Sequence, residues 1–526
     1  MHHLRAHSSG CRQQVFQRPI ERLLKCDFKH RGSNKSCPGQ SLGILCVKSV
    51  NAVLEDWIQE QGGQMPTKLS LSQQSLNNFT MVCKESLEKG RTLIRLPRKI
   101  LMTIETARKA QDYGHIVDSA ALSEWQALIL HLICERARGK DSFWAPFISA
   151  LPDQAQHPLL WDEEHLKWLT GSPMSSVLHD RQSQVVEDRD AILKAIPQDT
   201  LMGQPKEDLI SLDLVRWAAA TLLSRAFSLD LADDMEGMEG DMSYFGSWQP
   251  TSQVNDTLAL VPWVDMMHHC SQAGPESCLR FSFEIDAVML SAHRAYTEGS
   301  EVFCSFGPNL SPIDLLLDYG TSDEGNPNSK VELPTKVVAA PSSARSRALL
   351  EALSRVQGED SKLVLSPRGP DITTVAWVRA ALATDAELIK AGWRYKATAE
   401  DVELACRVMG TLSDPISKQN ESKVLAAFSA AAMEQLSSYP TSLEQDEEEE
   451  RDPLTGMTRR HVLRALISEK RSLVGTISVI KEWTMKLEAG LPLEELYADW
   501  DWGNEGDVYP TWEDEEEGDE EERPQA

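Results

Sequence analysis

Two stretches of the sequence are the most informative about its structure, LVPWVDMMHHC at residues 260–270 and EVFCSFGPNLSPIDLLLDYG at residues 301–320. Between them, apolar residues alternate with polar neighbours at Leu279, Phe281, Phe283 and Ile285 and continue from Val288 to Leu290. Alternation with a period of two predicts strands that lie on a half-buried surface. A turn at 297–299 leads into a further expected strand at 301–304. This part of the chain is therefore expected to be compact and rich in β-structure.

The residues before this region predict a mixture of helices and short strands. The expected elements are a helix at 53–61, strands at 81–83 and 92–96, and helices at 122–138 and 212–227. The segment 230–253 is rich in Gly, Met and Asp and has no period. It is expected to be an inserted loop.

The residues after Leu333 have a different character. Apolar residues with helical spacing predict amphipathic helices at 424–436 and 462–483. The stretch 325–345, with its Gly, Asn, Pro and Ser, is expected to be a domain junction. Together with the length of 526 residues, this predicts a chain of two or three domains.

The charge balance excludes some classes of function. The net charge of −27 argues against nucleic acid as the main partner, because phosphate binding depends on basic surface. No apolar run approaches the ~20 residues of a membrane-spanning helix. Acidic runs at 447–450 and 513–522 are expected to be solvated and disordered.

The ten cysteines are scattered singly, without a CxxC pair. Neither a disulfide framework nor a structural zinc site is indicated. The best metal candidates are His268, His269, Cys270 and Cys278, but adjacent residues rarely point at one ion, so no metal is expected.

Residues 1–48 are basic and poor in acidic residues, on a chain that is otherwise strongly acidic. This pattern is typical of an organellar transit peptide. An ordinary disordered N-terminus is the alternative.

The two opening stretches resemble motifs of the SET-domain family related to plant Rubisco lysine methyltransferase. LVPWVDMMHHC is similar to the family pattern vPxaDxxNHs, and residues 301–320 are similar to EvfisYG…SNaELLldYGF. SFWAPF at 142–147, RWA at 216–218 with SRAF at 224–227, and SYPTSLEQD at 438–446 resemble further family motifs. The resemblance covers about residues 50 to 490.

The resemblance implies an α+β fold: a SET-type β fold with a knot-like core and a helical insertion, followed by an all-helical C-terminal domain. The implied organisation is a transit peptide at 1–48, a SET domain at 49–335 with an insertion at about 105–250, a helical substrate-binding domain at 336–490, and an acidic disordered tail at 491–526. The implied reaction is methyl transfer from S-adenosylmethionine to a protein side chain, with lysine as the expected acceptor.

The resemblance also assigns roles to individual residues. Tyr319 is the implied catalytic tyrosine, whose hydroxyl orients the acceptor amine. Arg225 is expected beside both donor and substrate, and Asp265 is expected at the acceptor channel. The implied donor-binding residues are Asn78, Phe79, Thr80, Arg225, His268 and His269. From local sequence alone, a buried core tyrosine, a salt-bridged arginine, a capping aspartate and a core histidine remain alternatives for Tyr319, Arg225, Asp265 and His269.

Several positions depart from the family pattern. Asn78 and Thr80 stand where glycines allow close approach of the backbone, and His268 replaces an asparagine. Phe306 replaces a tyrosine, and Thr321 replaces a phenylalanine. These departures keep a second interpretation open, a catalytically degenerate SET-fold module that only binds protein.

The expected partner is a protein substrate, with neither nucleic acid nor membrane involved and with an oligomeric state that the sequence does not define. The transit-like leader favours the chloroplast stroma, and the cytoplasm or nucleus is the alternative.

Overall fold

The computed structural model describes residues 52–65, 69–75, 78–119, 121–152, 157–230, 256–273, 279–307, 309–357, 362–394 and 397–497. The chain divides into two compact units, residues 1–49 and 50–526, and every described residue lies in the second unit. The predictions for the basic leader and the acidic run at 513–522 concern residues outside the described ones. The predicted loop at 230–253 also lies outside them, except for Asp230. The tail expected to be disordered from residue 491 is ordered at its start, because residues 491–497 contain the 3₁₀ turn η8 (Leu493–Glu495) and the buried Tyr497.

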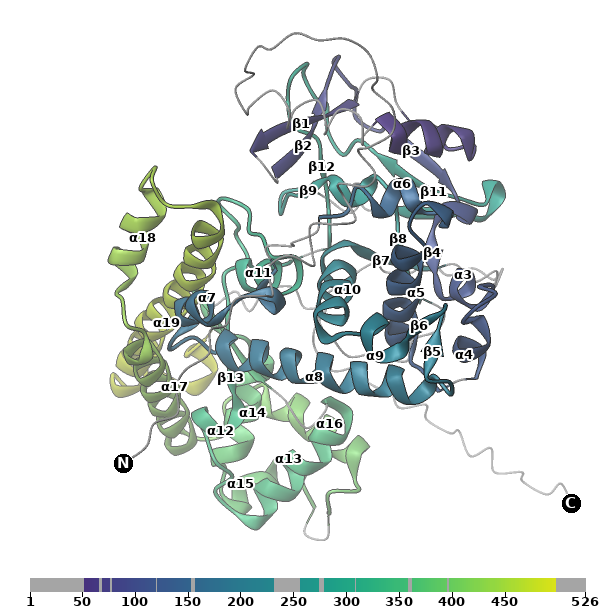
Figure 1. The fold of residues 1–526 in the computed structure, drawn as a ribbon. Coiled ribbons are helices and arrows are strands. Elements are labelled where there is room, and N and C mark those ends of the chain that lie inside the picture. Colours follow the sequence, from purple (N-terminus) through teal and green to yellow (C-terminus); the bar gives the residue numbers. More distant parts are fainter. Residues whose placement is uncertain are drawn as a thin grey trace, which may run out of the picture. The chain divides into compact units, whose positions relative to one another are not determined.

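The β-structure consists of several small sheets rather than one large sheet (Figure 1). A helix at 52–60 precedes the first of them. The paired strands are β1 (Leu69–Ser75) with β2 (Asn78–Cys83), β10 (Arg280–Ser282) with β11 (Ala287–Ser291) and β3 (Thr92–Pro97), β4 (Met102–Thr103) with β8 (Asp256–Leu260) and β7 (Ala226–Asp230), and β5 (Thr200–Leu201) with β6 (Gln204–Pro205). All of these pairs are antiparallel.

The predicted strand at 279–285 is shorter than expected. Strand β10 ends at Ser282, and residues Phe283–Ile285 form a 3₁₀ turn that leads to Asp286 with φ of 47°. Because β10 and β11 pair with each other, the chain must reverse between them, and the apolar Phe283 side chain is left 41% exposed. The alternating pattern here covers a strand and its turn.

Helices fill the segment between β4 and β7. They are α3 (Ile104–Arg108), α4 (Gly114–Asp118), α5 (Glu124–Arg138), α6 (Ala145–Ile148), α7 (Glu163–Leu166), α8 (Met174–Ala195), α9 (Lys206–Leu209) and α10 (Leu212–Arg225). The helix predicted at 122–138 is confirmed as α5, which begins after a capping box formed by Ser123 and Gln126. The helix predicted at 212–227 ends at Arg225, where the chain enters β7.

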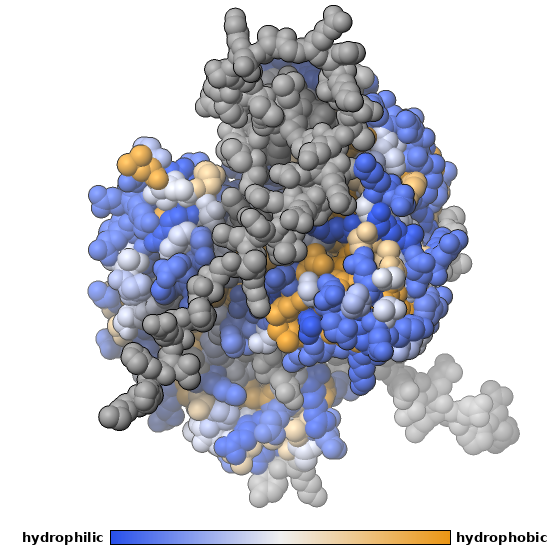
Figure 2. Space-filling model, viewed as in Figure 1, coloured by the Kyte–Doolittle hydropathy of each residue, from blue (hydrophilic) through white to orange (hydrophobic). Residues whose placement is uncertain are grey.

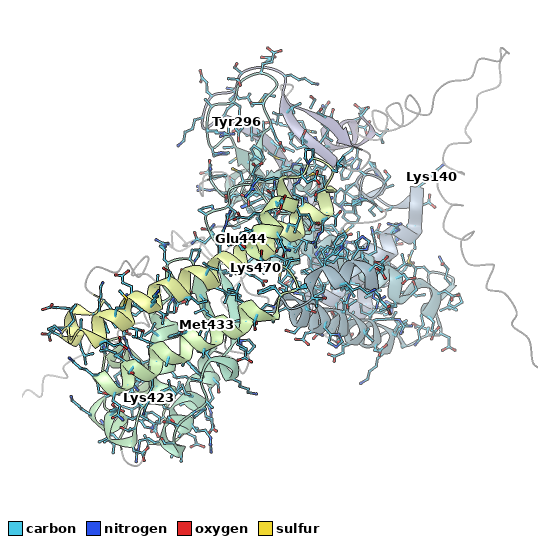
Figure 3. The ribbon with its side chains drawn as sticks, turned by 90° about the vertical axis from the view of Figure 1, so that its left-hand side faces the viewer. Lys140, Tyr296, Lys423, Met433, Glu444 and Lys470 are labelled. Carbon is cyan, nitrogen blue, oxygen red and sulfur yellow. The ribbon has the colours of Figure 1, made fainter. Side chains whose placement is uncertain are left out.

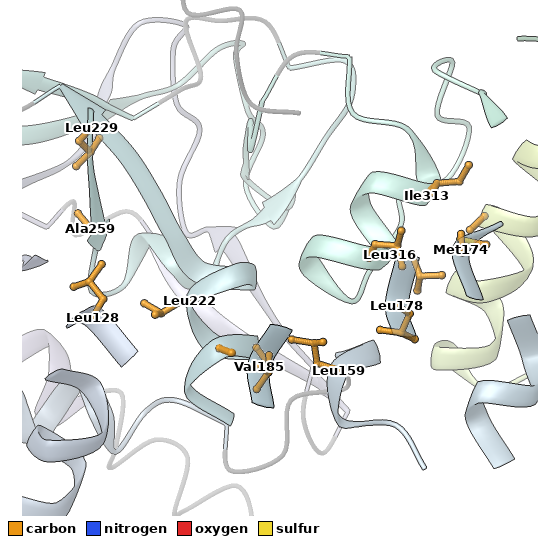
Figure 4. Close-up of a cluster of buried hydrophobic side chains, with 14 of the residues drawn as sticks. Leu128, Leu159, Met174, Leu178, Val185, Leu222, Leu229, Ala259, Ile313 and Leu316 are labelled. Carbon is orange, nitrogen blue, oxygen red and sulfur yellow. The ribbon is translucent and has the colours of Figure 1, made fainter. Parts of the chain in front are cut away.

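One hydrophobic core connects this helical insertion with the sheets and with α11 (Pro312–Tyr319). Leu128 and Leu222 lie near Ala259 and Leu229 of the β7–β8 pair (Figure 4). On the other side of the cluster, Leu316 and Ile313 of α11 lie beside Met174 and Leu178 of α8. Burial of each such side chain contributes about 1.5–3 kcal/mol, so α8 holds α11 firmly.

The residues after α11 are mainly helical, and the fold class is confirmed. The C-terminal domain is not all-helical, however, because the segment 362–370 forms two strands instead of a helix. The helices are α12 (Thr335–Val338), α13 (Ala344–Gln357), α14 (Ile372–Leu382), α15 (Asp385–Lys390), α16 (Val402–Leu412), α17 (Lys418–Ser438), α18 (Leu443–Arg451) and α19 (Met457–Glu488). A small antiparallel sheet lies among them, formed by β13 (Val331–Pro334), β14 (Lys362–Ser366) and β15 (Gly369–Pro370). The long helices α17 and α19 lie side by side (Figure 3).

The acidic run at 447–450 is ordered, which contradicts the prediction of disorder. It belongs to α18, which begins with a capping box formed by Ser442 and Gln445. Arginines of the adjacent α19 neutralise the run. The ion pairs are Arg459 with Glu449 at 2.8 Å, Arg464 with Glu450 at 2.9 Å, and Arg471 with Glu447 at 2.7 Å. A charge run that repels itself in isolation is thus stabilised by cations that lie 10 to 24 residues later in the sequence.

A buried joint connects the helical insertion with α17 and α19. Glu469 of α19 accepts hydrogen bonds from Ser172 Oγ and from the Tyr439 hydroxyl, both at 2.9 Å. The Gly171 carbonyl accepts from Gln435 Nε2 at 2.8 Å and from Ser438 Oγ at 2.7 Å. This joint fixes the insertion against the C-terminal helices.

The visible surface is mostly hydrophilic, with a hydrophobic area near the middle of the view (Figure 2). Among the described helices, none combines the length and the apolar character that crossing a membrane requires.

Candidate functional site

The stretches 260–270 and 301–320 meet in space. Strand β9 (His268–His269) pairs in parallel with β12 (Phe303–Cys304), so that His268 lies opposite Phe303 and His269 lies opposite Cys304. The 3₁₀ turn η5 (Val264–Met266) comes just before β9 and packs beside β2. Trp263, at the start of this turn, has a φ of 76°, a backbone conformation that is rare for a bulky residue and indicates local strain.

Three aromatic rings form a row across this junction. The Phe306 ring stacks on the Tyr319 ring with centroids 4.6 Å apart. The His269 ring also lies next to Phe306, with centroids 5.4 Å apart. The Phe306 amide donates a hydrogen bond to His269 Nδ1 at 3.1 Å. Phe306 therefore connects the chain around His269 with the chain around Tyr319.

His269 is a neutral side chain with a defined tautomer. Burial lowers its pKa to about 4, and Nδ1 is the acceptor for the Phe306 amide, so the proton lies on Nε2. That Nε2–H group is buried and has no hydrogen-bond partner among the described residues. The indole Nε1–H of Trp263 is in the same situation. Unsatisfied buried donors are costly, about 1–3 kcal/mol each, and a polar ligand with acceptor atoms would relieve that cost.

Arg225 and Asp265 form a pair. Arg225 Nη1 donates to Asp265 Oδ2 at 3.1 Å and to the Asp265 backbone carbonyl at 2.8 Å. Arg225 is the last residue of α10, and Asp265 lies in η5, so the pair connects the helical insertion to the turn. Burial raises the pKa of Asp265, and the Arg225 guanidinium opposes that rise. Arg225 is thus a salt-bridged arginine, which is the alternative that local sequence left open for it.

His268 also has a partner that the sequence analysis missed. Its Nδ1 lies 2.7 Å from Glu301 Oε1, and 41% of its side chain is exposed. Glu301 is bridged to Val82 of β2, which places the β2 strand next to β12. Glu301 is the first residue of the stretch 301–320, but the motif does not predict its contact with His268, which depends on the pairing of β9 with β12.

The predicted residues Asn78, Phe79 and Thr80 lie on β2. Thr80 is buried, and its hydroxyl lies 3.5 Å from the Ser72 carbonyl of β1. The backbone of Asn78 pairs with Ser75 and that of Phe79 with Gln73, whereas the side chains of Asn78 and Phe79 lie outside the described ones. The strand therefore borders η5.

Tyr319 is the C-terminal residue of α11 and is followed by Gly320 in the left-handed conformation, with φ of 67°. Burial raises the pKa of its phenol, so the hydroxyl stays protonated at neutral pH. Among the residues that the structure describes, no group of three or more His, Cys, Asp or Glu is arranged to hold a metal ion.

Comparison with known proteins places this geometry in a class. The fold matches a solved structure of the SET domain of LSMT bound to lysine and AdoHcy, with a TM-score of 0.65 over 86% of this chain and 94% of that chain, at 19% identity. It matches a structure of Rubisco LSMT bound to AdoMet with a TM-score of 0.64 over 86% of this chain and 96% of that one, also at 19% identity. The fold is therefore the SET-domain fold.

A more particular match concerns the C-terminal helices. The family model described as Rubisco LSMT substrate-binding matches residues 351–473. The chain thus has the Rubisco LSMT type of architecture, a SET fold followed by this substrate-binding domain, as the sequence resemblance implied.

The curated relatives are protein methyltransferases. One is the actin-histidine N-methyltransferase of Danio rerio, 24% identical over 76% of this chain. Another is the chloroplastic ribulose-1,5-bisphosphate carboxylase/oxygenase large subunit N-methyltransferase of Pisum sativum, 23% identical over 74% of this chain and 74% of the relative. The chain spans 63% of the length of the Danio rerio relative. The chain is therefore related to protein methyltransferases, and the relatives differ in the residue that they modify.

The residues of this site fit a methyl donor of the kind held by the solved structures named above. The segment that includes β9 carries two buried N–H donors, on Trp263 and His269, that have no hydrogen-bond acceptor among the described residues. At two of the positions that depart from the family pattern, the side chains contact neighbouring segments, Thr80 at the Ser72 carbonyl and His268 at Glu301.

Proposed function

We propose that the chain transfers a methyl group from S-adenosylmethionine to a lysine side chain of a protein. The observation that supports this most is the row formed by His269, Phe306 and Tyr319, which joins the two motif stretches within a SET fold. In this proposal the SET domain occupies residues 49–335 and the substrate-binding domain occupies residues 336–490.

Each site residue has a role in the proposal. The residues around the donor are Asn78, Phe79, Thr80, Arg225, His268 and His269. When bound, the donor supplies an electrophilic methyl group on a sulfonium. The protein's contribution is positioning and electrostatics, since a displacement of this kind needs no covalent intermediate on the enzyme.

Tyr319 is the proposed catalytic residue. Its phenol remains protonated, because burial raises its pKa, and it can therefore orient an amine lone pair without competing as a nucleophile. Asp265, which is buried and paired with Arg225, is the residue that we assign to the acceptor side. A buried environment favours the neutral form of an amine, which is the form that carries the nucleophilic lone pair.

The first test is titration of the full chain with S-adenosylmethionine by calorimetry. Saturable heat with one donor per chain supports the proposal. Absence of heat and of thermal stabilisation up to millimolar donor would favour instead a degenerate module that only binds protein.

The second test is Tyr319→Phe, for which we expect a loss of methyl transfer by roughly a hundredfold or more, with donor affinity changed less than about threefold. Transfer is measured with isotope-labelled donor in a cell extract. Tyr497→Phe, which removes another buried tyrosine hydroxyl, is the control and should retain transfer. A Tyr319→Phe variant that transfers methyl groups at the unmodified rate contradicts the role of Tyr319.

The acceptor residue is tested by mass spectrometry of the labelled proteins. Methyl-lysine supports the proposal, and methyl-histidine would place the chain with the actin-histidine enzymes instead. We further propose that the chain works in the chloroplast stroma, as residues 1–48 and the chloroplastic relative suggest. A fluorescent fusion of residues 1–48 that stays in the cytosol would contradict this location.

A further inference from the structure

The turn that carries Tyr319 has backbone groups that α11 itself cannot satisfy. A helix leaves its last four carbonyls without intrahelical partners, and α11 is only one residue longer than two turns. Two side chains of the insertion supply the missing donors. Arg181 Nη1 of α8 donates to the Leu317 carbonyl at 2.7 Å, and His157 Nε2 donates to the Asp318 carbonyl at 2.9 Å.

These two donors are well fixed. His157 is 1% exposed, and its Nδ1 accepts a hydrogen bond from the Leu159 amide at 3.2 Å, so the proton lies on Nε2. Arg181 is anchored a second time by an ion pair with Asp318 Oδ1 at 2.6 Å. Helix α8 also packs its apolar face against α11 near Leu316 (Figure 4). The N-terminal side of Tyr319 is therefore held by the insertion.

The chain after Tyr319 is held by a different element. Ser322 donates its backbone N–H to His461 Nδ1 of α19 at 3.1 Å, and its hydroxyl oxygen lies 3.0 Å from the same nitrogen. Arg464, one turn later on α19, donates to the Ser322 carbonyl at 3.4 Å. Both peptide groups of Ser322 are thus bound by side chains of the domain that spans 351–473.

His461 acts here as a neutral acceptor. Burial lowers its pKa to about 4, with the Arg464 charge contributing, so Nδ1 keeps its lone pair at neutral pH. Between the two anchors lie Tyr319, Gly320 and Thr321. Gly320 and Thr321 donate back to the Leu316 and Leu315 carbonyls at 3.0 and 3.2 Å, which leaves this short segment little freedom.

We infer that His461 and Arg181 are positioning residues for Tyr319, and that through His461 the substrate-binding domain fixes the phenol against Phe306. This inference rests on the proposed function, because positioning matters only if the Tyr319 hydroxyl orients an acceptor. It assigns to α19 a part in the site in addition to docking of a protein substrate.

The experiment compares His461→Leu, which removes the acceptor and keeps much of the volume, with His461→Asn, whose side-chain oxygen can replace Nδ1. His179→Leu, at an exposed position of α8, is the control. The first readout is the fluorine resonance of 3-fluorotyrosine placed at position 319 in the full chain, which needs neither donor nor acceptor. We expect His461→Leu to shift or broaden this resonance by more than its line width, and His461→Asn and His179→Leu to leave it in place.

The second readout is methyl transfer with labelled donor in cell extract. His461→Leu should reduce turnover by roughly tenfold to a hundredfold, with donor affinity unchanged, because small misplacements of a reacting group have effects of that size. His461→Asn should restore most of it. A folded His461→Leu protein whose fluorine resonance coincides with that of the unsubstituted chain overturns the inference.

The inference remains testable if a variant does not fold or if no donor binds. If His461→Leu does not fold, Arg181→Met replaces it, and an unshifted resonance in that variant overturns the inference in the same way. If the unsubstituted chain binds no donor, the proposed function fails, while the fluorine result still decides whether α19 fixes the phenol.

Discussion

At the residue scale, the most demanding interaction lies away from the site, in the substrate-binding domain. Arg379 and Glu421 are fully buried, and their side chains are joined at 2.7 and 3.2 Å. The Tyr497 hydroxyl donates to the same carboxylate at 2.6 Å. Breaking a buried ion pair leaves one charge uncompensated in the interior, which is far more costly than losing an exposed pair.

We therefore expect Glu421→Gln to lower the free energy of unfolding by about 3 kcal/mol or more. Glu403→Gln is the matched control, because Glu403 pairs with Arg407 at 3.4 Å on the surface, with side chains 71% and 55% exposed. That substitution should cost less than about 0.5 kcal/mol. Urea unfolding followed by circular dichroism measures both, and equal costs would mean that the buried pair is not an essential contact.

From the sequence, site residues could be predicted only where a motif contains them. Tyr319, Asp265 and His269 lie in two short patterns, and the roles assigned to them stay predictions. His157, Arg181 and His461 were not found, because each reaches its partner from a distant part of the sequence and has no local signature. Glu301 lies within a motif, but its contact with His268 was not predicted. Arg379 and Glu421 were missed for the same reason, since charged residues on a helix normally face solvent.

At the element scale, the two glycines of α16 and α19 differ in what they face. Gly475 of α19 lies against the loop that joins β14 and β15, and a Cβ atom there would lie 2.2 Å from the Pro367 carbonyl oxygen. Gly410 of α16 has no neighbouring atom within 4 Å of such a Cβ. The same change should therefore have opposite signs at the two positions.

We expect Gly410→Ala to stabilise the chain by about 0.5–1 kcal/mol, because alanine is the better helix former. Gly475→Ala should instead destabilise it by roughly 1–3 kcal/mol, since the helix or the loop must move. Thermal unfolding by calorimetry decides the matter. A Gly475→Ala protein with an unchanged melting temperature would show that α19 does not press on this loop.

Elements were predicted well where a period was long and poorly where charge or a turn intervened. The helices α5, α17 and α19 have apolar residues at helical spacing over three or more turns, a period that a strand does not have. The acidic run of α18 reads as disordered in isolation, because its neutralising arginines lie on α19. The strand expected at 279–285 was too long, because an alternating pattern does not mark where a hairpin reverses.

At the scale of the whole molecule, Glu469 connects the insertion with the C-terminal helices and makes that joint sensitive to pH. Burial raises the pKa of Glu469 to about 7, against an ordinary value of 4.5. Between these two values the folded protein holds a proton that the unfolded chain has released. The stabilisation is therefore complete at low pH and is lost as the pH rises through 7.

We expect the unsubstituted chain to lose stability relative to Glu469→Gln between pH 5 and pH 8, by on the order of 3 kcal/mol at most. Glutamine is neutral throughout this range and of the same size, so it removes the titration and keeps the packing. Melting temperatures of both proteins at several pH values test this. Parallel curves would mean that Glu469 stays ionised in the folded protein.

The sheet of β13, β14 and β15 determines where a fragment of this chain can begin. Strand β13, at 331–334, lies before the C-terminal helices in the sequence and pairs with β14, which lies among them. The adjacent Lys330 forms ion pairs with Asp314 of α11 and with Glu332, both at 3.1 Å. A fragment that starts at residue 336 would leave one whole side of β14 with bare peptide groups, ready to recruit a strand from another molecule. Fragments that begin before Lys330 include β13, so β14 stays paired, and these fragments should remain monomeric.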